Sequence, residues 1–87
     1  MNNTNTNKTE QKQKTEILPD GRIGEWWYHS FTDGMDEWHT TVEQAKQWIK
    51  ERRNEGYRNF RIYTELCEKH GDMMEESLLW AEGNFPD

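Results

Sequence analysis

The most informative segment of the chain is Trp26-Trp27-Tyr28-His29-Ser30-Phe31, which is followed by the dipeptide Asp33-Gly34. Its aromatic density and the turn residues beside it predict a β-strand over residues 25–31. Successive side chains of a strand point to opposite faces, so aromatic side chains fall on both faces of this one. A single helix can cover only one face of a small sheet, and the other aromatic face is therefore expected to be left for a partner.

Asp33-Gly34 predicts the turn of a β-hairpin. With these residues at the turn centre, the expected cross-strand pairs are Thr32 with Met35, His29 with Trp38, Tyr28 with His39, and Trp27 with Thr40. One face of the hairpin would then carry Trp27, His29, Phe31 and Trp38, and the other Trp26, Tyr28, Ser30 and His39.

A helix is expected over residues 41–55. Thr40-Thr41-Val42-Glu43 has the spacing of a capping box, with Thr40 as the N-cap residue and Glu43 at the third helical position. Gly56 provides a residue that can end the helix in the left-handed conformation. The apolar stripe of this helix consists of Val42, Ala45, Trp48 and Ile49, and a basic strip opposite consists of Lys46, Lys50 and Arg53.

The C-terminal part predicts two more strands. Residues 58–64 form the first, with Phe60 and Ile62 facing the helix. Residues 65–74 are expected to be a charged connection, and residues 77–81 a final short strand. The predicted fold is therefore an α+β domain with a small antiparallel sheet of three to four strands in the order ββαββ, and with one helix packed across one face.

Composition predicts one domain behind a polar tail. Residues 2–16 are all Asn, Thr, Lys, Glu or Gln, so we expect residues 1–16 to be disordered and residues 17–87 to form the domain. Leu, Ile, Val and Phe together number only 12 of 87 residues, but the chain has five Trp and three Tyr. Each aromatic side chain buries roughly 150–250 Å², which can supply the missing core area.

Charge is distributed unevenly along this acidic chain. The formal net charge of −6 argues against binding to nucleic acid or an anionic membrane by charge alone. Basic residues predominate over residues 43–61, and acidic residues over residues 65–87. Two interpretations stay open: the two blocks complement each other within the fold, or the acidic block imitates nucleic acid and steers association with a basic groove of a partner. The residues assigned to this role are Glu65, Glu68, Asp72, Glu75, Glu76 and Glu82.

No residue set predicts catalysis, a cofactor site or a metal site. Cys67, the single cysteine, excludes an internal disulfide and fits a reducing cytosol. Zinc could use only His29, His39, Cys67 and His70, yet the hairpin register places the first two on opposite faces. The adjacent carboxylates of Glu75 and Glu76 would also diverge. No phosphate-binding loop, dinucleotide fingerprint or nucleophile elbow is present, and no apolar stretch has the length of a signal peptide or a membrane span.

The expected partner-binding residues are Trp26, Tyr28, Arg61 and Tyr63, which would lie on the sheet face away from the helix. Three alternatives stay open for this face. The C-terminal segment could cover it, two protomers could bury it in a homodimer, or RNA bases could stack on it while Arg58, Arg61, Lys46 and Lys50 meet phosphates.

Residues 25–65 resemble small phage-encoded proteins that inhibit host or defence machinery, such as anti-CRISPR proteins and phage inhibitors of host RNA polymerase. The resemblance is carried by the aromatic hairpin, by Thr41-Val-Glu-Gln-Ala-Lys-Gln-Trp-Ile49, and by Phe60-Arg-Ile-Tyr63. It implies a non-enzymatic, stoichiometric inhibitor in the cytoplasm of a bacterial host. Such a protein would occlude a site on a larger bacterial protein that handles nucleic acid.

Overall fold

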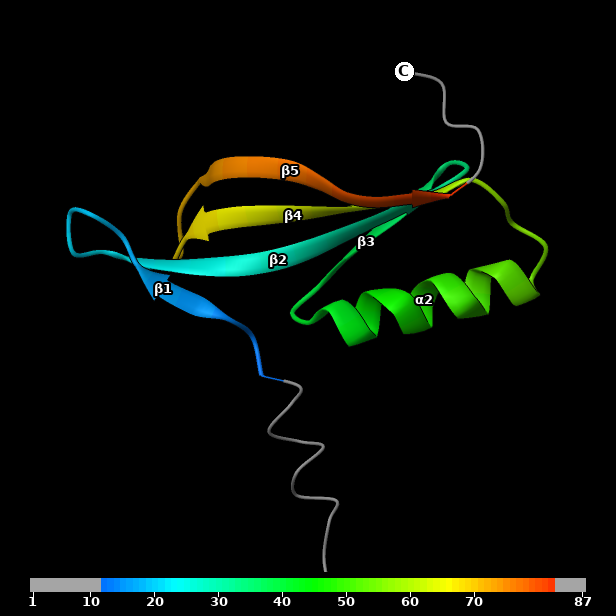
Figure 1. The fold of residues 1–87 in the computed structure, drawn as a ribbon, viewed down its shortest axis with the longest axis horizontal. Helices are drawn as coiled ribbons and strands as arrows, with labels where there is room; N and C mark the ends of the chain where they lie inside the picture. Colours follow the sequence, from blue (N-terminus) through cyan, green and yellow to red (C-terminus); the bar gives the residue numbers. More distant parts are fainter. Residues whose placement is uncertain (1–11, 83–87) are drawn as a thin grey trace, which may run out of the picture.

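The computed structural model of the chain describes residues 12–82 (Figure 1). Its elements are β1 (Thr15–Ile17), β2 (Ile23–Thr32), β3 (Met35–His39), α2 (Val42–Asn54), β4 (Phe60–Glu68) and β5 (Met73–Glu82). The predicted α+β class with a single helix is confirmed for these residues, and the antiparallel sheet has five strands where three to four were expected.

β2 is the central strand of the sheet. Along one edge it pairs with β4, and along the other it pairs with β1 near its beginning and with β3 near its end. β5 pairs with the far side of β4 and forms an edge of the sheet. The helix lies beside β2 and β3, so β5 and the β1 end of the sheet extend beyond it (Figure 1).

The hairpin register predicted from Asp33-Gly34 is confirmed. Thr32 lies opposite Met35, His29 opposite Trp38, and Tyr28 opposite His39. Gly34 has a φ of +76°, a left-handed conformation that glycine adopts without a steric cost. The turn therefore fixes which side chains of the two strands are neighbours.

The helix begins one residue later than the capping-box reading predicted. Thr41, and not Thr40, is the N-cap residue, and its hydroxyl accepts a hydrogen bond from the backbone N–H of Gln44. The side chain of Gln44 reaches back in turn to the backbone N–H of Thr40. The two adjacent threonines allow either register, and the structure uses the one that places Gln44 at the third helical position. Gly56 follows the helix with a φ of +104°, as expected for its end.

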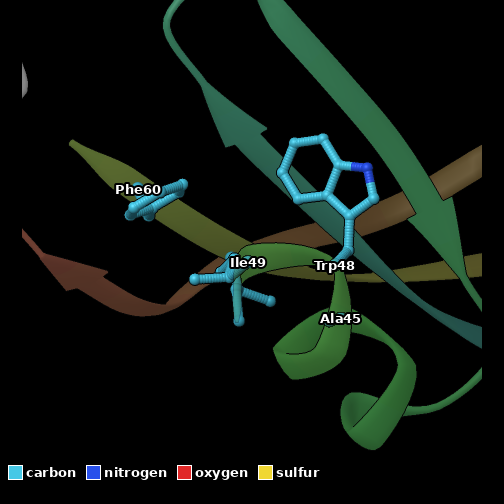
Figure 2. Packing of buried hydrophobic residues seen from close by; sticks show 5 residues of the cluster. Ala45, Trp48, Ile49 and Phe60 are labelled. Carbon is cyan, nitrogen blue, oxygen red and sulfur yellow. The ribbon is translucent and has the colours of Figure 1, made fainter. Parts of the chain in front are cut away.

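The core lies between the helix and one face of the sheet. Ala45, Trp48 and Ile49 of α2 pack with Phe60 and Ile62 of β4, and all five are buried (Figure 2). Partly buried Tyr28, Met35 and Tyr57 surround this cluster. The expected apolar stripe of the helix is confirmed for its three buried members, and Val42 lies at its margin, half-buried.

The two faces of β2 are the reverse of the expected assignment. We expected Trp26 and Tyr28 to lie away from the helix, but Tyr28 contacts the core cluster while Phe31 packs on Tyr63 on the opposite face. Two further residues of β2 on the helix side, Ser30 and Thr32, are small and polar, and both are buried. Because both faces of the strand are aromatic, hydrophobicity alone could not select the face.

The two C-terminal strands are longer than expected. β4 continues through Glu68 and β5 begins at Met73, so the predicted charged connection over residues 65–74 is mostly strand. Residues between them form a tight turn in which His70 has a φ of +60°. The turn brings the backbone N–H of Gly71 to within 2.8 Å of the carbonyl of Glu68. We expected a connection here because residues 65–74 are rich in charged side chains, but exposed positions of a strand tolerate such side chains.

The N-terminal boundary of the domain also differs from the expectation. Thr15 and Glu16, which we assigned to the disordered tail, belong to β1 and pair with Glu25 and Gly24. The three side chains of this strand are exposed, and backbone pairing with β2 and the hydrogen bond between the Trp26 indole N–H and Glu16 hold it in place. Gly24 permits the close approach of neighbouring leucines, since an added Cβ would lie 2.9 Å from Leu66 Cδ1. Residues 1–11 of the expected tail lie outside the described residues.

Candidate partner-binding surface

One face of the sheet points away from the helix, and we call it the outer face. The cross-strand pairs between β2, β3, β4 and β5 define it. Its members are Trp27, His29, Phe31, Asp36, Trp38, Arg61, Tyr63, Glu65, Cys67, Glu76 and Leu78. No helix lies over this face among the residues that the structure describes (Figure 1).

Aromatic rings form a continuous row across the outer face. The imidazole of His29 stacks on Trp38 with ring centroids 3.9 Å apart and lies 4.0 Å from the ring of Phe31. The rings of Phe31 and Tyr63 pack in a T-shaped arrangement with their centroids 5.5 Å apart. The guanidinium of Arg61 donates a 2.8 Å hydrogen bond to the Tyr63 hydroxyl. Trp38 is 53 % exposed, and Leu78 of β5 is 55 % exposed. The row therefore presents broad apolar surface held in a fixed geometry.

A buried polar cluster supports this row from below. His29 Nδ1 lies 2.7 Å from Glu65 Oε2, and His29 Nε2 lies 2.6 Å from Asp36 Oδ2. The indole N–H of Trp38 donates to the other oxygen of Glu65 at 3.1 Å. His29 and Glu65 are both buried, whereas Asp36 is exposed. Buried charged groups need such partners, and these bonds fix the orientation of the imidazole and the indole.

Glu76 adds a further carboxylate beside this cluster. A hydrogen bond with Glu65 raises the pKa of Glu76, and burial and the negative charge of Glu65 raise it further. Ligand atoms of His29, Glu65 and Glu76 lie within 4.8 Å of one another, which is close enough for one cation to reach all three. Hydrogen bonds to Asp36, Trp38 and Glu76 already account for the arrangement of the buried pair, so we assign no metal to it.

A small pocket opens beside the cluster on the outer face. It has a volume of about 250 Å³ and is lined by Trp27, Trp38, Glu65 and Cys67. Burial raises the pKa of the Cys67 thiol, and the negative charges of Glu65 and Glu25 raise it further. The thiol is therefore uncharged at neutral pH.

The opposite side of the sheet carries a second, larger groove, with a volume of about 470 Å³. It runs between the helix and β5 and is lined by Val42, Lys46, Ile49, Arg53, Ile62, Leu79 and Trp80. Arg53 forms an ion pair with Glu82 at 2.7 Å and lies over the ring of Phe60. Two members of the basic strip expected on the helix, Lys46 and Arg53, therefore border this groove and not the outer face.

β5 is the most exposed strand of the sheet. All ten of its residues are exposed, although it pairs with β4 along its length. Five of them are large and apolar, namely Met73, Met74, Leu78, Leu79 and Trp80. A long edge strand with apolar side chains on both faces can pair with another strand.

The four predicted partner-binding residues are divided between the two faces. Arg61 and Tyr63 lie on the outer face, as expected. Tyr28 instead packs against the core cluster, and Trp26 lies opposite Leu66 on the helix side. The indole N–H of Trp26 donates to Glu16 in β1 at 3.0 Å. The expectation that all four share one surface is therefore wrong, because the two faces of β2 were assigned the wrong way round.

The predicted steering residues differ in exposure. Glu65 is buried and paired with His29, so its expected place on an exposed acidic surface is wrong. Glu68 is half-buried and forms an ion pair with Arg22. The remaining members, Asp72, Glu75, Glu76 and Glu82, are exposed along the β4–β5 turn and β5. The exposed members of the predicted set therefore lie at the β5 edge.

Trp27, Trp38 and Leu78 were not among the predicted binding residues. The hairpin register already placed Trp27 and Trp38 on one face with His29, so the signal for them was present. Leu78 could not have been assigned, because its face depends on a register shift between β4 and β5 near Ile62 and Tyr63. The hairpin register predicted that His29 and His39 point to opposite faces, and this is confirmed. His29 is bonded to Asp36 on the outer face, whereas His39 lies near Trp48 of the helix.

Within residues 12–82, no helix combines the length and the hydropathy needed to cross a bilayer. Comparison of the chain with protein-family models, with curated proteins and with solved structures gave no match.

Proposed function

We propose that the chain is a non-enzymatic protein-binding module that occludes a site on a larger bacterial protein, one that handles nucleic acid. The observation that carries the proposal is the row of aromatic side chains on the outer face, which no helix covers among residues 12–82. Exposed apolar patches of this kind mark interaction sites in soluble proteins. Trp, Tyr and Arg are the residue types that most often contribute binding energy at interfaces.

The anchors in this proposal are Trp38, Tyr63 and Leu78, with Arg61 beside them. Trp38 and Leu78 are more than half exposed, so their burial by a partner would remove a large apolar area from water. Tyr63 is held by Phe31 and Arg61, so little conformational entropy is lost when a partner covers it. The exposed carboxylates at the β5 edge would speed association with a basic partner.

The geometry favours a protein partner over nucleic acid. Base stacking on the outer face would require cationic groups nearby to meet phosphates. Lys46 and Arg53 border the groove on the helix side, and Arg61 is the one cationic side chain among the named outer-face residues, where the carboxylates of Asp36, Glu65 and Glu76 outnumber it. Carboxylates therefore outnumber cations where the bases would have to stack, which disfavours phosphate there.

Self-association through β5 is the second candidate. Its support is that every residue of this ten-residue edge strand is exposed and that five of them carry large apolar side chains. Two copies could pair their β5 strands and continue the sheet across the contact. Sedimentation analysis between micromolar and millimolar concentration tests this candidate, which requires a dimer that a proline at Leu78 abolishes.

The test of the main proposal compares two double variants as tagged bait in a bacterial lysate. Tyr63→Ala with Leu78→Ala truncates the outer face, and Leu79→Ala with Trp80→Ala truncates the helix-side groove to a similar extent. We expect the parent and the helix-side variant to retain the same protein and the outer-face variant to lose it. The retained protein is then purified and titrated calorimetrically with each bait, and equal affinity of the two variants would overturn the proposal.

A further inference from the structure

The pocket on the outer face has the chemistry of a receptor for a positively charged side chain. The side chains of Trp27 and Trp38 line it together with Glu65 and Cys67, and the Glu65 carboxylate accepts a hydrogen bond from the indole N–H of Trp38. We propose that this pocket binds one lysine or arginine side chain of a partner protein. This inference rests on the proposed function and names the group of the partner that the outer face recognises.

The walls favour a cation because an aromatic ring attracts positive charge to its face. Trp38 is fixed for this role, since His29 stacks on it at 3.9 Å and its indole N–H is bonded to Glu65 at 3.1 Å. A side chain entering the pocket therefore meets an indole that does not have to reorient. The same bonds hold the Glu65 carboxylate in place.

The charge around the pocket also favours a cation. Three carboxylates, those of Asp36, Glu65 and Glu76, surround the single imidazole of His29. Glu65 is buried, so its charge is poorly screened by water and interacts strongly with a group that enters beside it. The carboxylates near the pocket outnumber its one imidazole, which favours an ammonium or guanidinium group over an anion beside the indole rings.

The size of the pocket favours a side chain over a complete small molecule. Its volume of about 250 Å³ is below the roughly 300–1,000 Å³ of ordinary ligand pockets. Its remaining lining residue, Cys67, is an uncharged thiol that can contact the aliphatic stem of lysine or arginine. The pocket therefore offers an apolar surface to the stem of a lysine or arginine side chain, and aromatic rings to its charged head group.

The test is a titration of the full chain with three blocked tripeptides, Gly-Arg-Gly, Gly-Lys-Gly and Gly-citrulline-Gly. Citrulline has the shape of arginine without its charge, so it isolates the contribution of the charge. The readout is the chemical shift of the indole N–H groups of Trp27 and Trp38 in a nitrogen–proton correlation spectrum. We expect saturable shifts with the arginine or lysine peptide and about tenfold weaker binding of the citrulline peptide.

Two variants locate the interaction. Trp27→Ala removes one wall without touching the hydrogen bonds of the His29 cluster, and Glu65→Gln removes the charge while it keeps the shape. Trp80→Ala, on the helix side, is the matched control. We expect both pocket variants to weaken the arginine peptide about tenfold and the control to leave it unchanged. Spectra of the free variants show whether each is folded. If Glu65→Gln does not fold, Trp27→Ala alone decides the result.

Equal shifts with the arginine and citrulline peptides would overturn the inference, as would unchanged affinity in Trp27→Ala or the absence of a saturable shift. These outcomes are separable from the proposed function. If the outer-face bait variant loses its partner while the peptides do not bind, the surface binds a protein by other contacts. If the peptides bind while no protein depends on the outer face, the pocket is real and the proposed function fails.

Discussion

Replacement of His29 by leucine tests the buried cluster that supports the outer face. The imidazole lies 2.7 Å from Glu65 and 2.6 Å from Asp36, and the side chains of His29 and Glu65 are both 8 % exposed. Leucine has a similar volume but no hydrogen-bonding group, so it leaves the Glu65 carboxylate buried without its ring partner. Removal of one member of a buried pair costs about 3–5 kcal/mol.

We expect the free energy of unfolding of His29→Leu to fall by about 3–5 kcal/mol, a large part of the roughly 5–15 kcal/mol available to a small domain. Chemical denaturation followed by tryptophan fluorescence measures this change. The double variant His29→Leu with Glu65→Leu removes both buried groups and should recover most of the loss, because no buried charge is then left without a partner. A loss below about 1 kcal/mol in the single variant, or a double variant less stable than the single one, would refute the reasoning.

Three further predictions concern the core, the helix start and the pocket thiol. Trp48→Ala should cost about 3–5 kcal/mol of unfolding free energy because Trp48 is buried in the core, whereas Trp80→Ala should cost much less. Equal losses for the two variants in a denaturation experiment would contradict the packing. Thr41→Ala should cost about 1 kcal/mol by removing the N-cap hydrogen bond, while Thr40→Ala should cost less. Because burial raises the pKa of the Cys67 thiol, iodoacetamide should alkylate it more slowly at pH 8 than it alkylates free cysteine. An alkylation rate equal to that of free cysteine would show that the site is not buried.

The pH dependence of stability follows from Glu76, whose pKa is raised mainly by its hydrogen bond with Glu65. The folded protein therefore holds this proton more tightly than the unfolded chain does. The stabilising contribution is complete below the unfolded pKa of about 4.3 and is lost as the pH rises through the folded value. Glu76→Gln should abolish that part of the dependence, so the melting temperatures of parent and variant should diverge as the pH is raised from 4 to 7. Parallel curves would contradict the assignment.

The parts of the fold that local chemistry determines could be predicted from the sequence. The Asp33-Gly34 turn fixed the hairpin register, and the spacing of Ala45, Trp48 and Ile49 gave the buried side of the helix. Both signals depend on residues close together in the chain, where turn geometry and helical periodicity leave few alternatives.

The rest depended on pairing between distant segments. His29 and Glu65 are 36 residues apart, and only the β2–β4 register brings them together. Glu65 therefore looked like a loop residue, although Trp38 and His29 satisfy its carboxylate inside the sheet. The face of Tyr28 was misassigned because aromatic residues occupy both sides of its strand, so the pattern lacked the contrast that normally distinguishes core from surface.

The most direct test of the binding surface uses two adjacent leucines of β5. Leu78 lies on the outer face and is 55 % exposed, whereas Leu79 lines the helix-side groove and is 49 % exposed. A photo-crosslinking amino acid is placed at each position in turn, and the chain is irradiated in bacterial cells and analysed by mass spectrometry. A crosslink from position 78 to one larger bacterial protein, absent from position 79, is the predicted result. Crosslinks from position 79 alone, or from position 78 only to a second copy of this chain, would contradict a partner-binding outer face.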